Sequence, residues 1–313
     1  MSNAYWYVTA VLAKELGIAL HATQMLSTHM HEVLTDTLGL LPRFLQKRNR
    51  VLAAFIKAHR GWPEEVFARG SPNCVQLYGG AAVLKKIGYT IANCVEAGLV
   101  RRPAMWPGVS AVVEERPRVI RARRPALYFD TERARWPEFA EIVLVMPRVL
   151  EREMGGRAPN AVLAAVHAAV IAARQHVAAR GGRFADPLSL TRISHETRAT
   201  SDEGVRPRAP SFATGGLQHL RGLAVAERRD FLTRYRLALG RAQRGRRPTF
   251  PEGAWRVHTE YGFRRKTTGG NPERRTLRAR TAGASRPVRR SGVHSAAGTK
   301  KGARRPRVER GPP

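Results

Sequence analysis

The sequence has few cysteines, few acidic residues and no long apolar run. It has two cysteines in 313 residues. Cys74 and Cys94 form no Cys-x-x-Cys pair, which excludes a zinc ribbon and predicts two buried free thiols in a reducing cytoplasm. The longest apolar run, residues 161–173, is interrupted by His167 and is shorter than the ~20 residues that a membrane span needs. Residues 1–10 lack the pattern of a signal peptide, so no membrane contact is expected.

Acidic residues are outnumbered by basic ones, at 24 against 55, so the formal net charge is +31. Such an excess is typical of proteins that bind a polyanion, and nucleic acid is the expected partner. A membrane surface is less favoured, because no segment pairs a basic face with an aromatic one. Residues 264–313 are rich in Arg, Gly, Ser and Thr and have almost no apolar side chains. This tail is predicted to be disordered, because it cannot bury enough surface to fold.

The periodicity of apolar residues predicts alternating helices and strands. Apolar residues recur at helical spacing up to Leu16, and Gly17 ends that helix. The elements predicted after it are strands at 18–23 and 25–35, a helix at 41–59, a strand at 73–77, a helix that begins at 79–80, a strand at 141–146, and helices at 159–180 and 217–242.

Two short patterns of polar side chains stand out. His29 and His31 flank a methionine, and residues i and i+2 of a strand point to the same face. Tyr89 and Asn93 lie one turn apart on one face of a predicted helix. If that helix face packs on that strand face, two imidazoles, an amide oxygen and a phenol converge. Such a set can bind a divalent metal and carry a tyrosine nucleophile that attacks a phosphodiester.

Each of these residues also has an ordinary structural interpretation. A histidine pair can lie at a sheet surface without a ligand, because a metal site needs a third donor within reach. Asn93 can cap the end of its helix. Tyr89 lies off the apolar stripe of its helix, which argues against a core position. Glu32 faces the opposite side of the strand from the histidines, and His21 is interpreted as a core histidine in preference to a role beside the site.

The sequence around these motifs resembles the IS200-like transposases, and within them the REP-associated tyrosine transposases. The histidine strand of that family is similar to Leu26-Ser27-Thr28-His29-Met30-His31. The family's tyrosine helix reads Tyr, three residues, Asn-Pro-Val, one residue and Ala-Gly-Leu-Val, which is similar to the stretch from Tyr89 to Val100. Trp106-Pro107 follows, as Trp-Pro does in the family. The resemblance covers about residues 17–110.

The resemblance implies an HUH-type transposase with a single catalytic tyrosine. It implies an α+β domain over residues 1–112, built as a ferredoxin-like antiparallel sheet with helices on one face. Tyr89 is implied as the catalytic nucleophile, and His29, His31 and Asn93 as the ligands of Mg²⁺ or Mn²⁺. The implied reaction is the cleavage and rejoining of single-stranded or hairpin DNA during DNA transposition, in a bacterial cytoplasm at the nucleoid. A homodimer is left open.

Residues 113–263 are predicted to form a basic, mostly helical accessory region, with an Arg/Pro-rich connector at 116–125 and a linker at 194–210. Basic side chains close to the motifs are candidates for contacts with the DNA backbone. For those on the helix after the histidine strand, a solvated surface is an equal alternative, and those after the tyrosine helix can also complement its C-terminus. The candidates are Arg43, Lys47, Arg48, Arg50, Arg101 and Arg102.

The sequence departs from the family pattern at four points. Thr28 stands where the family has asparagine, Glu32 where it has leucine, and Cys94 where it has proline. Family members begin with a strand before the first helix, whereas Met1 leads directly into that helix, which is expected to open an edge of the sheet. Two other functions are therefore kept as alternatives, a non-catalytic nucleic-acid-binding descendant of such a transposase and a ribosome-associated basic protein.

Overall fold

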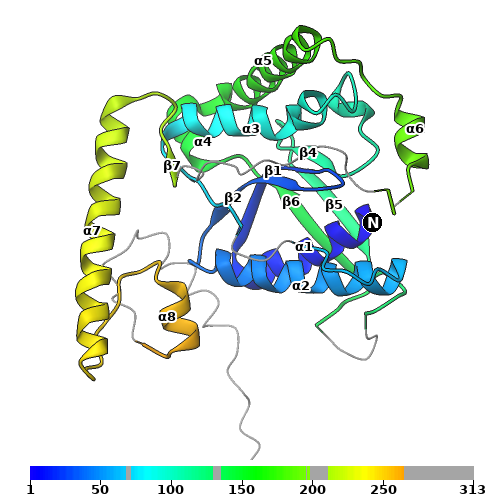
Figure 1. The fold of residues 1–313 in the computed structure, drawn as a ribbon. Coiled ribbons are helices and arrows are strands. Elements are labelled where there is room, and N and C mark those ends of the chain that lie inside the picture. Colours follow the sequence, from blue (N-terminus) through cyan, green and yellow to red (C-terminus); the bar gives the residue numbers. More distant parts are fainter. Residues whose placement is uncertain (68–71, 130–134, 195, 198–210, 264–313) are drawn as a thin grey trace, which may run out of the picture. The chain divides into compact units, whose positions relative to one another are not determined.

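The central feature of the fold is a five-stranded mixed sheet with the strand order β2-β1-β6-β5, in which β4 also pairs with β1 (Figure 1). The computed structural model describes residues 1–67, 72–129, 135–194, 196–197 and 211–263. Its strands are β1 (Ile18–Met25), β2 (Met30–Asp36), β3 (Gln76–Leu77), β4 (Ser110–Val112), β5 (Arg118–Arg123), β6 (Phe139–Leu144) and β7 (Phe212–Ala213). Its α-helices are α1 (Ser2–Leu16), α2 (Leu41–Arg60), α3 (Gly79–Glu96), α4 (Arg148–Met154), α5 (Ala158–Ala179), α6 (Pro187–Arg192), α7 (Gln218–Gln243) and α8 (Trp255–Glu260). The protein is therefore an α+β protein, as expected.

The sheet is mixed, whereas an antiparallel sheet was predicted. Strand β1 is antiparallel to β2 and β4, but it is parallel to β6, with Leu20 opposite Leu144. The predicted connector at 116–125 contains β5. Strand β5 forms an antiparallel pair with β6, and β6 in turn lies beside β1. Strands β4 and β6 both pair with the edge of β1 away from β2, so within the described residues β2 and β5 stand at the two ends of the strand order.

Helices cover both faces of the sheet, which corrects the prediction of helices on one face (Figure 1). Helices α1 and α2 pack on one face, where Leu20 of β1 is buried. Helices α3, α4 and α5 pack on the other, where Ala22 is buried. A β-bulge between Leu20 and Ala22 changes the alternation, so β1 supplies apolar side chains to both faces. The predicted boundary after residue 112 falls between two strands of this one sheet, within the compact unit Met1–Thr268.

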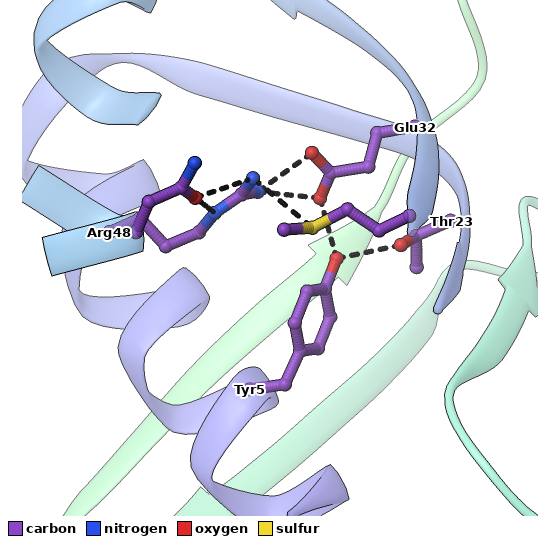
Figure 2. A network of polar contacts seen from close by, with 6 residues as sticks. Tyr5, Thr23, Glu32 and Arg48 are labelled. Atoms are coloured by element: carbon purple, nitrogen blue, oxygen red, sulfur yellow. Dashed lines mark hydrogen bonds and ion pairs between the residues drawn. The ribbon is translucent and has the colours of Figure 1, made fainter. Parts of the chain in front are cut away.

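A buried ion pair ties β2 to α1 and α2 (Figure 2). Arg48 of α2 is 1% exposed, and its Nη1 donates to both carboxylate oxygens of Glu32, at 2.6 and 2.7 Å. The Tyr5 hydroxyl of α1 donates to the same carboxylate at 2.6 Å and lies 2.6 Å from the Thr23 hydroxyl. Burial and the Glu32 charge raise the pKa of Tyr5 well above its usual value, so Tyr5 remains a donor. Glu32 and Thr23 are cross-strand partners, so the network joins both strands of the hairpin.

Helices α3 and α5 pack closely because of Gly88. A Cβ atom at Gly88 would lie 2.6 Å from the Ala165 carbonyl oxygen, which is closer than real contacts allow. The helical stretch Arg148–Ala179, which contains α4 and α5, is long and apolar enough to cross a membrane by length and composition alone. Its residues Val162 and Val170 pack into clusters with α3, but only 28% of its apolar window is buried; by itself, a single such stretch is weak evidence for a membrane span.

The C-terminal described residues add a small second sheet and a long helix. Strands β3 and β7 pair in parallel, and the Tyr78 hydroxyl beside β3 donates to Glu227 of α7 at 2.6 Å. Cys74 is exposed and not buried as predicted, because the predicted strand at 73–77 is formed only at its last two residues. Most of the predicted linker at 194–210 and the whole predicted disordered tail at 264–313 lie outside the described residues.

The ion pair under β2 leads to a prediction about stability. Arg48→Met should lower the free energy of unfolding by about 3–5 kcal/mol, because it leaves the Glu32 carboxylate buried without its cation. The double variant Glu32→Leu with Arg48→Met should recover most of that loss, because no charge then remains in the core. Urea unfolding followed by circular dichroism measures both. A double variant no more stable than Arg48→Met alone would contradict the coupling.

Candidate active site

The two histidines of the candidate site lie at the start of β2 and face α3. His31 is the second residue of β2. His29 directly precedes the strand, in the turn after β1, and its carbonyl accepts the Leu26 N–H at 2.8 Å. The two imidazole rings pack edge to face with their centroids 5.0 Å apart. The predicted strand at 25–35 is therefore interrupted by a turn, but the two histidines keep the same-face relation that i, i+2 spacing predicts.

Tyr89 and Asn93 approach the histidines from α3. The Asn93 Oδ1 lies 3.0 Å from His29 Nε2, and Asn93 is 7% exposed. The Tyr89 ring packs edge to face on the His31 ring at 5.1 Å between centroids, and Tyr89 is 44% exposed. Asn93 is not the C-cap, because α3 ends at Glu96 and its C-cap is Ala97, whose N–H donates to the Asn93 carbonyl. The four predicted side chains thus form one continuous chain of contacts.

Two further polar contacts hold this arrangement. The Thr28 hydroxyl lies 2.9 Å from His29 Nδ1. Gln24, which is fully buried and opposite His31 on β1, accepts the Cys94 N–H of α3 at 3.1 Å. Cys94 stands where the resembled family has proline, which has no N–H. In this chain the Cys94 N–H donates to Gln24, a side chain outside the helix. Burial raises the pKa of the Cys94 thiol to about 11, so it is protonated at neutral pH and is a poor nucleophile.

Lys86 is a functional candidate that the sequence reasoning missed. Its Nζ lies 5.1 Å from the centroid of the Tyr89 ring. Lys86 precedes Tyr89 by three residues on α3, so the i, i+3 spacing of a helix was the signal that could have revealed it. An ammonium group at this position can attract a phosphate group to the tyrosine.

A divalent cation at this site stays a prediction, and its donors would be two imidazole nitrogens and one amide oxygen. Within the described residues, no group of three or more His, Cys, Asp or Glu side chains could hold a metal, so a metal here needs the Asn93 amide as a donor. An octahedral Mg²⁺ or Mn²⁺ ion at about 2.1 Å from its ligands holds neighbouring ligand atoms about 3 Å apart. His29 Nε2 and Asn93 Oδ1 are separated by 3.0 Å, a distance that is typical of a hydrogen bond and is also compatible with that spacing. The His31 ring lies next to them and can supply the third donor.

His21 is a core residue and takes no part in the site, as the sequence reasoning favoured. It is buried on β1, with Nδ1 2.6 Å from the Val145 carbonyl and Nε2 2.8 Å from the Thr35 hydroxyl. Burial lowers its pKa, and the contact with the Val145 carbonyl offsets this in part.

The basic residues predicted on α2 are not placed alike. Arg48 is buried against Glu32 and cannot reach a DNA backbone, which corrects its assignment. The Lys47 ammonium pairs with Glu15 at 2.8 Å. Arg43 and Arg50 are exposed. Because α2 packs on the face of the sheet opposite α3, these side chains are separated from Tyr89 by the sheet.

Arg101 and Arg102 are exposed just beyond α3, where either of their predicted roles is sterically open. The Arg101 guanidinium lies 5.8 Å from the centroid of the Phe184 ring, and its carbonyl accepts a hydrogen bond from Arg174.

A larger group of arginines lies on α7, which the sequence reasoning described as basic without assigning its residues. Its exposed arginines are Arg221, Arg228, Arg229, Arg234, Arg236 and Arg241.

No protein-family model, curated protein or solved structure matches the chain significantly. The functional assignment therefore depends on the geometry of the site and on the motif resemblance.

The lowered pKa of His21 gives a prediction about pH. A folded pKa below the unfolded value of about 6.5 means that the unfolded state binds more protons as the pH falls. The His21 contribution is thus fully present above about pH 6.5 and is lost below it. The difference in free energy of unfolding between pH 8 and pH 5 should therefore be smaller in His21→Gln than in the wild type. An equal pH dependence in His21→Gln and the wild type would contradict the assignment.

Proposed function

We propose that the protein cleaves and rejoins single-stranded DNA at hairpin-bearing ends, as a transposase of the HUH type with a single catalytic tyrosine. The observation that carries this proposal is the chain of contacts from Asn93 through His29 and His31 to Tyr89. A phenol that is 44% exposed beside two imidazoles and an amide oxygen is suited to attack on a phosphodiester. A cytoplasmic, nucleoid-associated location belongs to this proposal, because the substrate is DNA.

The chemistry that we propose needs no external energy source. His29, His31 and Asn93 would hold Mg²⁺ or Mn²⁺, which polarises the scissile phosphate and stabilises its developing charge when bound. The Tyr89 oxygen forms a bond to phosphorus and the bond from phosphorus to the 3′ oxygen breaks. The phenolic proton passes to water, and the leaving 3′ oxygen takes a proton from water. The products are a 3′-hydroxyl and a 5′-phosphotyrosine. Attack by a 3′-hydroxyl on that linkage reverses the step and releases Tyr89, so the bond energy is conserved.

The finer fold assignment belongs to the same proposal. The segment from α1 to β4 supplies a helix, the β1–β2 hairpin, helix α2, the short strand β3, helix α3 and strand β4. A ferredoxin-like domain without its first strand has one helix between the hairpin and the last strand, so we propose that this segment is such a domain with one added helix and one added short strand.

A non-catalytic nucleic-acid-binding protein is the second candidate. The exposed arginines of α7 favour it, because a basic helix binds a phosphate backbone without any catalytic group. The two candidates share a DNA partner and differ in whether Tyr89 becomes linked to it.

The covalent link is the direct test of the proposed function. Wild-type protein with a labelled single-stranded hairpin substrate and Mn²⁺ should give a protein–DNA adduct on a denaturing gel. Tyr89→Phe should give none, because it removes the attacking oxygen and little packing volume. Tyr261→Phe, which changes another exposed tyrosine, should behave as the wild type. A chelator should abolish the adduct. A wild-type protein that is folded but forms no adduct with several hairpins would favour the non-catalytic candidate.

The placement of α7 gives a prediction about DNA binding. Arg228→Gln with Arg229→Gln should weaken binding to all DNA sequences and reduce the slope of log K against log salt concentration by about 2. The matched control is Arg43→Gln with Arg50→Gln, which removes the same charge from α2, a helix that packs on the face of the sheet opposite α3. Fluorescence anisotropy with a labelled hairpin measures both. An unchanged slope in the α7 variant with a reduced slope in the α2 variant would move the DNA-binding surface to α2.

A further inference from the structure

The two nitrogen atoms of His29 are both engaged by side chains. The Thr28 hydroxyl oxygen lies 2.9 Å from Nδ1, and Asn93 Oδ1 lies 3.0 Å from Nε2. A neutral imidazole carries one proton, so one of its nitrogens donates and the other accepts. The two contacts are therefore coupled, because the position of the ring proton determines which nitrogen of His29 donates and which accepts.

Two arrangements of the ring proton satisfy this coupling. In the first, the Thr28 hydroxyl donates to Nδ1, and Nε2–H donates to Asn93 Oδ1, which closes the His29–Asn93 contact as a hydrogen bond. In the second, Nδ1–H donates to the Thr28 oxygen, and the Nε2 lone pair faces Oδ1. Two acceptors 3.0 Å apart repel each other unless they share a cation. The second arrangement therefore suits a bound divalent metal.

We infer that Thr28 is a positioning residue that lets His29 change between these two tautomers. A hydroxyl can do this because it rotates to donate in the first arrangement and to accept in the second. This inference rests on the proposed function, since it assigns the second arrangement to the state that holds the divalent cation.

The position of Thr28 allows it to orient the His29 ring without contributing to the packing of the core. Thr28 is exposed in the turn after β1, so it contributes little to the core. Asn93 is held separately, because Gln24 accepts the N–H of the next residue, Cys94. A change at Thr28 therefore acts on the His29 ring and leaves the second donor in place.

The matched variants are Thr28→Val, which replaces the hydroxyl with a methyl group, and Thr28→Ser, which keeps it. Both should melt at the wild-type temperature. Mn²⁺ affinity, measured by the loss of the free-ion electron paramagnetic resonance signal, should fall about tenfold or more in Thr28→Val and should be retained in Thr28→Ser. Chemical shifts of the His29 ring nitrogens report the tautomer directly. On addition of Mg²⁺, the wild type and Thr28→Ser should change from Nε2–H to Nδ1–H, whereas Thr28→Val should remain Nε2–H at the same concentration.

The possible results distinguish a failure of the Thr28 inference from a failure of the proposed metal-dependent function. Equal Mn²⁺ affinity in the wild type and Thr28→Val, or the same tautomer change in both, would overturn the role of Thr28 and leave the metal site standing. A wild-type protein that binds no Mn²⁺, with His29→Ala giving the same result, would overturn both the inference and the metal-dependent function.

Discussion

The buried contact between Glu32 and Arg48 is the constraint on which the arrangement of the site depends. Glu32 follows His31 on β2, and successive side chains of a strand point to opposite faces. A slip of one residue would turn the carboxylate toward α3 and an imidazole toward Arg48. Two bonds of 2.6 and 2.7 Å and a third from Tyr5 oppose such a slip, because the slip would leave Arg48 buried without its partner. The direction of His31 is thus set by the side chain behind it.

The site is therefore held from two sides of the sheet. On one face, α1 and α2 hold Glu32 through Tyr5 and Arg48 (Figure 2). On the other, Gln24 of β1 holds the backbone of α3 next to Asn93, and the missing side chain of Gly88 lets α5 pack closely behind α3. Each of these contacts crosses between elements, so the spacing of the four candidate side chains follows from tertiary contacts more than from any one element.

Sequence reasoning succeeded where the signal was local. The spacing of His29 and His31 and of Tyr89 and Asn93 indicated which side chains share a face, and the structure brings these four together. It failed where one residue's environment depends on a distant partner. Arg48 looks like a surface arginine until Glu32, sixteen positions earlier, lies against it. Likewise, the Arg-rich stretch 116–125 was predicted to be a connector, but it contains strand β5. One of the arginines of β5, Arg121, pairs with Glu141 on the neighbouring strand β6. Neither pairing has a signature in the local sequence.

Two of the departures from the transposase pattern have compensating partners in this chain. Glu32 places a carboxylate where the pattern has an apolar side chain, and Arg48 neutralises it. Cys94 places an N–H where the pattern has proline, and Gln24 accepts it. A buried charge or donor without a partner costs free energy, so substitutions that accumulate without selection are expected to leave such groups unsatisfied. The departures next to His31 and Asn93 are instead matched by partners, and His29 Nε2 and Asn93 Oδ1 between them lie 3.0 Å apart. Both departures are therefore compatible with the packing around the four candidate side chains.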